Sequence, residues 1–340
     1  MGKTTHGLAK TTVDAPETGA LAAVPAASLP RLSESWRLAC DINRHSAETL
    51  AQRRFLLDKL VWFLRQRELP GCGTDEIRQF LHYVSHGHKE QGGRWGNPRM
   101  TRPTSARTAK NYHGILRAFF NWLVAEGELT ASPMERIPPP VYRASQVQPF
   151  TPEQVKALLA ATKRSLHPRR DEAICLFLLD TGVRATELCT LHRADVDLHA
   201  GRCTVLGKGN KTRVVPFSRD TKRALYNYLR EEEYDEQAAL FLSDRGVTAG
   251  AGLTRTGLRV LIGRLGKSAR IESARCSPHT FRHTFAVEFL RAGGNVFTLQ
   301  QLLGHTHLAM TSKYVAVSQA DVEAQHALFS PVARLKGRGK

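Results

Sequence analysis

The hydrophobic positions of the first 130 residues repeat with a helical period in three segments. The first segment begins at Ser46 and ends before Pro70, the second follows Thr74, and the third ends at Gly127, a typical C-terminal stop. Their apolar stripes consist of Leu50, Leu57, Leu60, Val61 and Leu64, then Ile77, Phe80, Leu81 and Val84, then Tyr112, Ile115, Leu116, Phe119, Phe120, Leu123 and Val124. The pattern predicts a small helical domain.

Three stretches around these helices lack a hydrophobic period. Residues 1–30 are rich in Thr, Ala, Gly and Pro, and we predict a disordered N-terminal arm because they cannot offset the entropy of ordering. A basic loop rich in Gly, Arg and Pro at 86–104 is expected to be mobile. Three prolines at 138–140 break the chain, so residues 141–150 are predicted to link a helical domain at 31–140 to a second domain.

The second domain is predicted at 151–330. It opens with Thr151-Pro152-Glu153-Gln154, which fits a capping box with proline in the first helical turn. Helices follow to about 192, then a hairpin formed by 203–206 and 212–217, then helices to the end, including a short one at 321–329. Residues 331–340 are a basic tail. The fold class is therefore mainly α with a small β-sheet.

The charge balance of the 340-residue chain indicates a polyanionic partner. Lys and Arg total 49 against 31 acidic residues, which gives a formal net charge of +18. Duplex DNA carries about one negative charge per 1.7 Å of helix axis, so a basic surface gains affinity from counterion release. Charge alone leaves open a basic surface of the ribosomal type that performs no chemistry.

Cysteine usage and hydropathy indicate the compartment. The six cysteines include no C-x-x-C pair, which is typical of reduced intracellular thiols. The small-residue run at 20–28 is interrupted by Pro25 and does not fit a signal peptide. No apolar run approaches the roughly 20 residues that span a bilayer, so we expect a cytoplasmic protein without a membrane partner.

Two basic residues lie at turns where a phosphate could bind. Arg184 follows Gly182 at the opening of a predicted helix, where free N–H groups and a guanidinium can hold anionic oxygens. Taken alone, such an arginine is usually solvated or ion-paired, and Glu187 could either orient it or neutralise it. Lys208 lies between two glycines at the hairpin tip. It is either simply solvated or a mobile ammonium that protonates a leaving oxygen.

A predicted helix that starts at Ser277 carries two further candidates. His279 and Arg282 are spaced i and i+3, so they share a helix face directed away from Phe281. His279 and His283 have the i, i+4 spacing of zinc-binding helices, but the required glutamate is absent and Arg282 would repel the ion. We therefore expect no metal.

His305 and Tyr314 lie near the carboxyl end. His305 follows a helix end at Gly304, and Tyr314 comes nine positions later. A lone tyrosine is usually an ordinary aromatic. The combination of two arginines, a lysine, two histidines and a late tyrosine, each at a turn or helix end, favours a common site.

The boxes that contain these residues resemble the signature boxes of tyrosine recombinases, in the same order. They read Thr-Gly-Val-Arg-Ala-Thr-Glu-Leu, Gly-Lys-Gly-Asn-Lys, His-Thr-Phe-Arg-His, Leu-Leu-Gly-His and the following Tyr, within 181–314. Residues 31–130 resemble the family's core-binding domain more loosely. The resemblance implies a helical core-binding domain followed by a mixed α/β catalytic domain. We expect no N-terminal arm-binding domain of the kind that some phage integrases have, because the stretch before residue 31 is short and predicted to be disordered.

The resemblance also implies a function and a site. The chain would be a site-specific recombinase or integrase that cleaves and rejoins DNA through a 3′-phosphotyrosyl intermediate and a Holliday junction. Its catalytic residues would be Arg184, Lys208, His279, Arg282, His305 and Tyr314. The reaction needs no cofactor, neither ATP nor metal. The implied partners are double-stranded DNA with paired recognition sites and a homo-tetramer on it, which would make the protein nucleoid-associated.

Two other functions fit the same boxes. A type IB topoisomerase-like enzyme would share the pocket but relax DNA as a monomer without sequence choice, and a non-catalytic DNA-binding protein could keep the fold. The sequence also leaves open the biological task, which could be chromosome dimer resolution, integration of a phage or element, or transposition.

Overall fold

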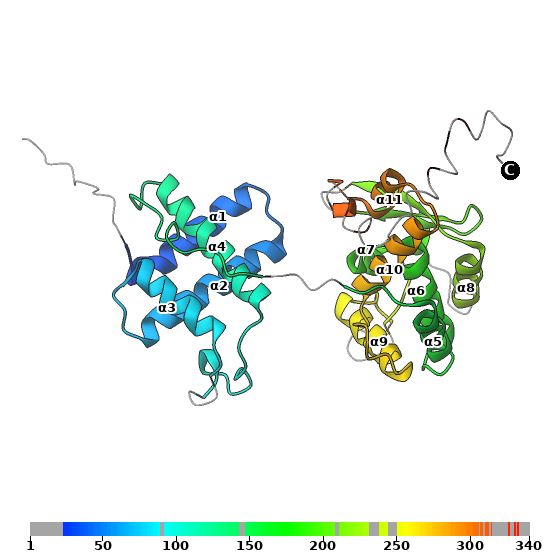
Figure 1. Ribbon diagram of the computed structural model, residues 1–340, viewed down its shortest axis with the longest axis horizontal. Helices are drawn as coiled ribbons and strands as arrows, with labels where there is room; N and C mark the ends of the chain where they lie inside the picture. The colour runs from blue at the N-terminus through cyan, green and yellow to red at the C-terminus, as the bar shows by residue number, and fades with distance from the viewer. Residues whose placement is uncertain are drawn as a thin grey trace, which may run out of the picture. The chain divides into compact units, whose positions relative to one another are not determined.

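The computed structural model describes residues 23–88, 92–142, 147–207, 211–230, 238–243, 250–305, 307–308, 310–312, 314, 326, 330 and 332. The chain divides into two compact units, Met1–Ser145 and Gln146–Lys340 (Figure 1). The described part is mostly helical with two small sheets, which confirms the predicted mainly α class. None of its helices combines the length and apolarity that crossing a bilayer requires.

Among its described residues, the first unit contains four α-helices, which are α1 Leu29–Ile42, α2 Ala47–Gln66, α3 Thr74–Ser85 and α4 Ala106–Ala125. The three predicted segments correspond to α2, α3 and α4. Ser46 starts α2 as expected, because its hydroxyl accepts a hydrogen bond from the Thr49 N–H. Fully buried side chains from these three helices form the core, among them Leu60, Leu64, Phe80, Leu116, Phe119 and Phe120.

The N-terminal arm is shorter than the sequence suggested. Residues 23–30 were expected to be disordered, but β1 (Val24–Pro25) pairs antiparallel with β2 (Gly71–Cys72), and α1 begins at Leu29. The helix buries Leu29, Leu32, Trp36 and Cys40. These four positions lie on one helical stripe, so burial offsets the ordering cost that the Ala- and Pro-rich composition implied. Residues 1–22 lie outside the described residues.

The described part of segment 86–104 is a loop as predicted, apart from the short 3-10 helix η2 (Arg94–Gly96), but its packing does not support the expected mobility. Arg94 is only 5% exposed and donates hydrogen bonds to the carbonyl oxygens of Val84 and Arg102. Its neighbour Trp95 packs edge-on against Trp62, with ring centroids 5.6 Å apart. Arg94 and Trp95 therefore hold the described part of this segment against the helices.

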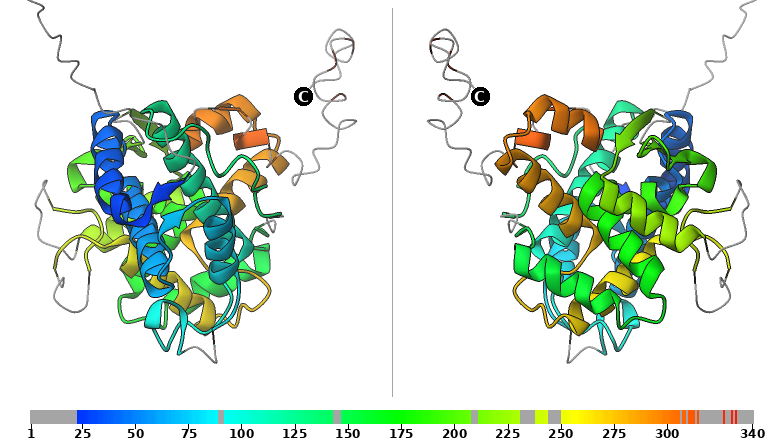
Figure 2. Two further views of the ribbon diagram at one scale, coloured as in Figure 1. Left: turned by 90° about the vertical axis from the view of Figure 1, so that its left-hand side faces the viewer. Right: turned by 90° about the vertical axis from the view of Figure 1, so that its right-hand side faces the viewer.

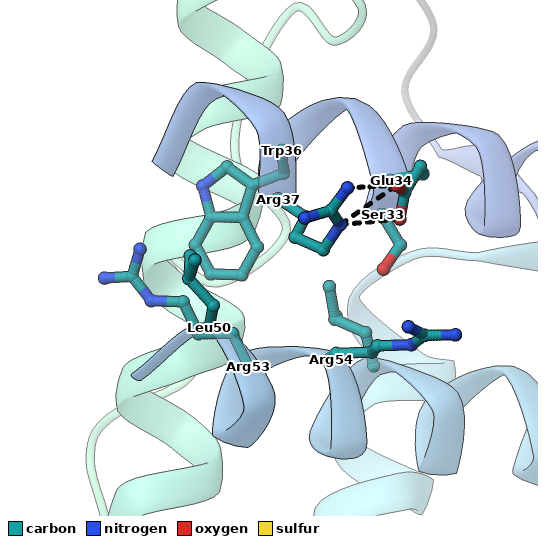
Figure 3. Close-up of a pocket in the computed structure, with 8 residues that line it drawn as sticks. Ser33, Glu34, Trp36, Arg37, Leu50, Arg53 and Arg54 are labelled. Carbon is teal, nitrogen blue, oxygen red and sulfur yellow. Dashed lines mark hydrogen bonds and ion pairs between the residues drawn. The ribbon is translucent and has the colours of Figure 1, made fainter. Parts of the chain in front are cut away.

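A small pocket between α1 and α2 lies in this unit (Figure 3). The Arg53 guanidinium covers the Trp36 ring at 4.7 Å from its centroid and donates to the Cys40 sulfur at 2.7 Å. Arg37 is paired with Glu34 at 2.6 Å. Because these guanidinium groups already have partners, the pocket is a packing feature of the helix pair.

The second unit contains seven helices and one three-stranded sheet among the described residues. The helices are α5 Pro152–Thr162, α6 Pro168–Thr181, α7 Ala185–Thr190, α8 Arg219–Leu229, α9 Arg255–Ser268, α10 Pro278–Arg291 and α11 Val296–Leu303. The central α6 contacts α5, α8 and α10 (Figure 1), and the right-hand view of Figure 2 shows α8 as the outer layer beside it. Thr151 and Ser277 cap α5 and α10 as predicted.

The sheet has the antiparallel order β3-β4-β5, with β3 Val196–Asp197, β4 Arg202–Leu206 and β5 Thr212–Pro216. The predicted hairpin is confirmed, and its register pairs Cys203 with Val215. The two-residue β3 was not predicted, because so short a strand carries no period. Lys208 and the rest of its turn, together with most of the segment beyond 314, lie outside the described residues. These include nearly all of the predicted helix at 321–329 and of the tail at 331–340.

Candidate active site

The turn between α6 and α7 positions Arg184. Helix α6 ends on Gly182, which has the left-handed φ of 59°, and Arg184 is the N-cap of α7. A Cβ at Gly182 would lie 2.3 Å from the Phe285 ring, so only glycine fits between the turn and α10. The predicted location of Arg184 at a helix opening is therefore what the structure shows.

Glu187 holds the Arg184 side chain. Its Oε1 accepts from Arg184 Nη1 at 2.7 Å, and its Oε2 accepts from the Arg184 backbone N–H at 2.7 Å. Burial alone would raise the pKa of Glu187, but hydrogen bonds from Arg213 and Arg184 and the charge of Arg213 outweigh it and lower the pKa to about 2. Of the two readings left open by the sequence, orientation of Arg184 by an ionised Glu187 fits this geometry.

Arg282 on α10 is buried beside His305. Its Nη1 donates to the Gly182 carbonyl at 2.8 Å, and its Nη2 donates to the Leu303 carbonyl and to His305 Nε2, both at 2.8 Å. Burial and the Arg184 charge lower the pKa of Arg282 to about 10, so it remains a cation at neutral pH. The guanidinium thus ties α10 to the end of α6 and to the end of α11.

The contacts of His305 assign its tautomer. A guanidinium only donates, so His305 Nε2 must accept from Arg282, and the ring proton lies on Nδ1. That Nδ1 lies 2.8 Å from the Thr311 hydroxyl, which accepts from it. In this state neither ring nitrogen of His305 is ready to donate to a phosphate.

Tyr314 lies against the same cations. Its ring is 6.3 Å from that of His305 and nearly parallel to it, and 5.2 Å from that of His283. Burial raises the pKa of the Tyr314 phenol, whereas the charge of Arg282, a hydrogen bond from it and the charge of Arg184 work in the opposite direction. Tyr314 is 1% exposed, so a ligand from outside the fold could reach its hydroxyl only if the ring moved outward.

The structure therefore brings together Arg184, Arg282, His305 and Tyr314 out of the predicted set. His279 lies in the first turn of α10 and is exposed, whereas Arg282 on the same helix is 4% exposed. Lys208 lies outside the described residues. Within the described ranges, no group of three or more His, Cys, Asp or Glu residues could hold a metal ion.

Comparison with known proteins decides the family. The sequence profile of the phage integrase family matches residues 148–321. The tyrosine recombinase XerC of Bacillus pumilus is 32% identical over 306 residues, which cover 85% of this chain and 92% of the relative. The chain belongs to the phage integrase family. It is a site-specific tyrosine recombinase, and the resemblance seen in its signature boxes is confirmed.

Other comparisons agree with this assignment of the recombinase. The tyrosine recombinase XerD of Listeria monocytogenes serotype 4b is 32% identical over 232 residues, which cover 67% of this chain and 78% of that one. A Tn1549 transposon integrase in complex with circular intermediate DNA superposes with a TM-score of 0.64 and 21% identity, covering 90% of this chain and 99% of that one. A lambda integrase dimer bound to a core site gives the same TM-score at 18% identity, covering 86% and 77%. These two likenesses show the fold.

One residue of the recombinase site was missed by the sequence analysis. Arg213 in β5 donates to both carboxylate oxygens of Glu187, at 2.9 and 2.8 Å, and to the Leu302 carbonyl at 2.8 Å. A usable signal was present, because Arg213 shares the inward face of its strand with the buried Val215. An arginine on the buried face of a strand needs a fixed partner.

Proposed function

We propose that Tyr314 is the nucleophile with which the recombinase cleaves one DNA strand and forms a 3′-phosphotyrosyl bond. The observation that carries the proposal is the position of the Tyr314 ring, which lies 6.3 Å from the ring of His305, the residue that Arg282 contacts at 2.8 Å, so the phenol lies in the field of Arg282 and Arg184. Both cations favour the phenolate that attacks phosphorus. They would also attract the scissile phosphate to the same place.

The two guanidinium groups would stabilise the reacting phosphate. Phosphorus gains negative charge on its non-bridging oxygens as it becomes five-coordinate, and preorganised donors are most effective where such charge develops. When Arg282 turns to a phosphate oxygen, it releases His305 Nε2 from the contact at 2.8 Å. In the other tautomer of His305, Nε2 carries the ring proton and donates to the phosphate, while Nδ1 accepts from the Thr311 hydroxyl.

Protons and bonds balance without a cofactor. The phenol proton leaves as the bond between the Tyr314 oxygen and phosphorus forms, and the bond from phosphorus to the 5′ oxygen breaks as that oxygen gains a proton. We assign His279 to the first proton movement and Lys208 to the second, as the family resemblance implies. A second 5′-hydroxyl reverses the step and reseals the strand, so no ATP or metal is consumed.

The proposed assembly is a homo-tetramer on two paired sites in double-stranded DNA. It would exchange strands in pairs through a Holliday junction, and acting on chromosomal DNA would associate it with the nucleoid. Support comes from likeness to XerC and XerD recombinases and to the fold of an XerH recombinase bound to palindromic difH substrate. Inverted repeats in the DNA that flanks the gene would assign it to a mobile element.

A suicide substrate tests the proposal. A nicked duplex that carries the recognition site loses a short fragment on cleavage and traps the covalent adduct, which denaturing electrophoresis resolves. The wild-type protein is expected to form the adduct, and Tyr314→Phe is expected to bind the duplex equally well without forming it. An adduct with the variant would remove Tyr314 as nucleophile. Relaxation of arbitrary plasmids by monomers would favour the topoisomerase alternative, and binding without cleavage by the wild type would favour the non-catalytic one.

A further inference from the structure

Arg213 lies where three separate segments of the catalytic unit meet. It projects from β5, its Nη1 and Nη2 grip the Glu187 carboxylate on α7, and its Nε donates to the Leu302 carbonyl near the end of α11. Its side chain is 13% exposed. Each N–H-bearing nitrogen of the guanidinium therefore has an acceptor, and the group is fixed in one orientation.

The surrounding backbone is shaped around this guanidinium. Gly304 has a φ of 62°, and a Cβ placed there would lie 3.0 Å from Arg213 Nη1. A Cβ at Gly207 would make only an ordinary contact with the same nitrogen, at 3.5 Å. Gly304 thus allows the backbone after α11 to approach the Arg213 side chain closely.

Arg213 also determines how Glu187 acts on Arg184. A carboxylate paired with Arg184 alone would cancel its charge at the site where the phosphate binds. Instead, Glu187 accepts from two guanidinium groups, so one negative charge is shared between two positive ones. The Arg184 Nη2 donates to the Gly304 carbonyl at 3.1 Å, on the same backbone that packs against Arg213. Arg213 therefore contacts both groups that orient the Arg184 guanidinium, the Glu187 carboxylate and the backbone at Gly304.

We propose that Arg213 is a positioning residue for DNA cleavage, which acts through Glu187 on the fork of Arg184. The inference rests on the proposed function, in which Arg184 holds the non-bridging oxygens of the scissile phosphate. A lysine at position 213 keeps the positive charge, but its ammonium cannot donate to both oxygens of Glu187 in the bidentate way of a guanidinium. The Arg184 fork then loses its orientation, and the transition state loses part of its stabilisation.

The experiment compares Arg213→Lys with a matched control on the same hairpin. The control is Arg202→Lys on β4, whose side chain is 59% exposed and whose ion pair with Asp197 is 3.6 Å long. Single-turnover cleavage of the suicide substrate gives a rate constant and an amplitude. Partial unfolding lowers the amplitude, whereas misplacement of Arg184 lowers the rate constant. We expect Arg213→Lys to slow cleavage on the order of 100-fold and the control to cleave at the wild-type rate.

Two modified substrates show whether Arg213 acts through Arg184 or through Lys208. A methylphosphonate at the scissile position replaces one charged non-bridging oxygen by a neutral methyl group, so cleavage depends less on Arg184. A 5′-bridging sulfur makes a leaving group that needs no proton donor. The penalty of Arg213→Lys is expected to shrink at least tenfold on the methylphosphonate and to persist with bridging sulfur.

A wild-type rate constant for Arg213→Lys, or a penalty that is unchanged on the methylphosphonate, overturns the inference. A penalty that disappears with bridging sulfur also overturns it, because the residue would then act through the hairpin that carries Lys208. Failure of the proposed function is recognised separately, by an adduct that survives Tyr314→Phe. If Arg213→Lys cleaves at the wild-type rate and Tyr314→Phe forms no adduct, only the proposed role of Arg213 is refuted.

Discussion

Replacing Glu187 by Gln should destabilise the catalytic unit by a predictable amount. The carboxylate is 3% exposed and lies between Arg184 and Arg213. These partners lower its pKa from an ordinary value of 4.5 to about 2. The difference between the two values corresponds to about 3 kcal/mol of stability at neutral pH. A glutamine keeps the shape but leaves two guanidinium groups without their shared counter-charge.

The destabilisation should depend on pH in a defined direction. The folded pKa of Glu187 lies below the unfolded one, so its contribution is complete above pH 4.5 and is lost as the pH falls through about 2. At about pH 3.5 roughly 2 kcal/mol of it remains. Glutamine does not titrate. The difference in the free energy of unfolding between wild type and Glu187→Gln should therefore narrow between neutral pH and pH 3.5.

This difference is measured by urea unfolding, with the amide hydrogen exchange of peptides from α6, α7 and β5 as the probe of the catalytic unit. The chain supplies an internal control, because its four tryptophans all lie in the first unit, at Trp36, Trp62, Trp95 and Trp122. The fluorescence transition should be the same in both proteins. Equal stability of the catalytic unit at neutral pH, or a difference that does not narrow on acidification, would refute the reasoning.

Three further outcomes are expected. Gly182→Ala should lower the melting temperature of the catalytic unit, with a cost of roughly 1–3 kcal/mol, because its Cβ would meet the Phe285 ring at 2.3 Å; an unchanged melting temperature contradicts this. Thr311→Val should slow single-turnover cleavage about tenfold, since it removes the acceptor for His305 Nδ1, while Thr311→Ser should cleave normally. Burial raises the pKa of Cys72 to about 12, so iodoacetamide at pH 8 should leave it unmodified until urea is added, as mass spectrometry of the peptides would show.

The parts of the fold that were predictable carry their signals within a few residues. Ser46 and Ser277 mark helix starts because each hydroxyl accepts from a backbone N–H three positions later. The helix α1 was missed for a different reason. Its stripe from Leu29 to Cys40 follows a Pro- and Ala-rich stretch, and only pairing of β1 with β2 and packing on the other helices make ordering favourable.

In the candidate site, too, local signals were predictable and contacts between distant segments were not. The place of Arg184 follows from the adjacent Gly182, which is a local signal. The partners of Arg213 lie 26 residues before it, at Glu187, and 89 residues after it, at Leu302. No pattern within the strand identifies them, although the inward position of the arginine shows that a partner must exist. The burial of Tyr314 likewise arises from packing against α10 and α11.

The contacts of the site show how three neighbouring arginines are accommodated when no phosphate is bound. Arg184, Arg213 and Arg282 lie together, and Glu187 balances only part of their charge, so Arg184 and Arg213 both contribute to the lowered pKa of Arg282. Backbone carbonyls from Gly182, Leu303 and Gly304 offset the rest by accepting hydrogen bonds. These carbonyl dipoles are weaker partners than an anion. In the proposed mechanism a phosphate would be the stronger acceptor for the same donors, and its arrival would favour release of His305 from Arg282.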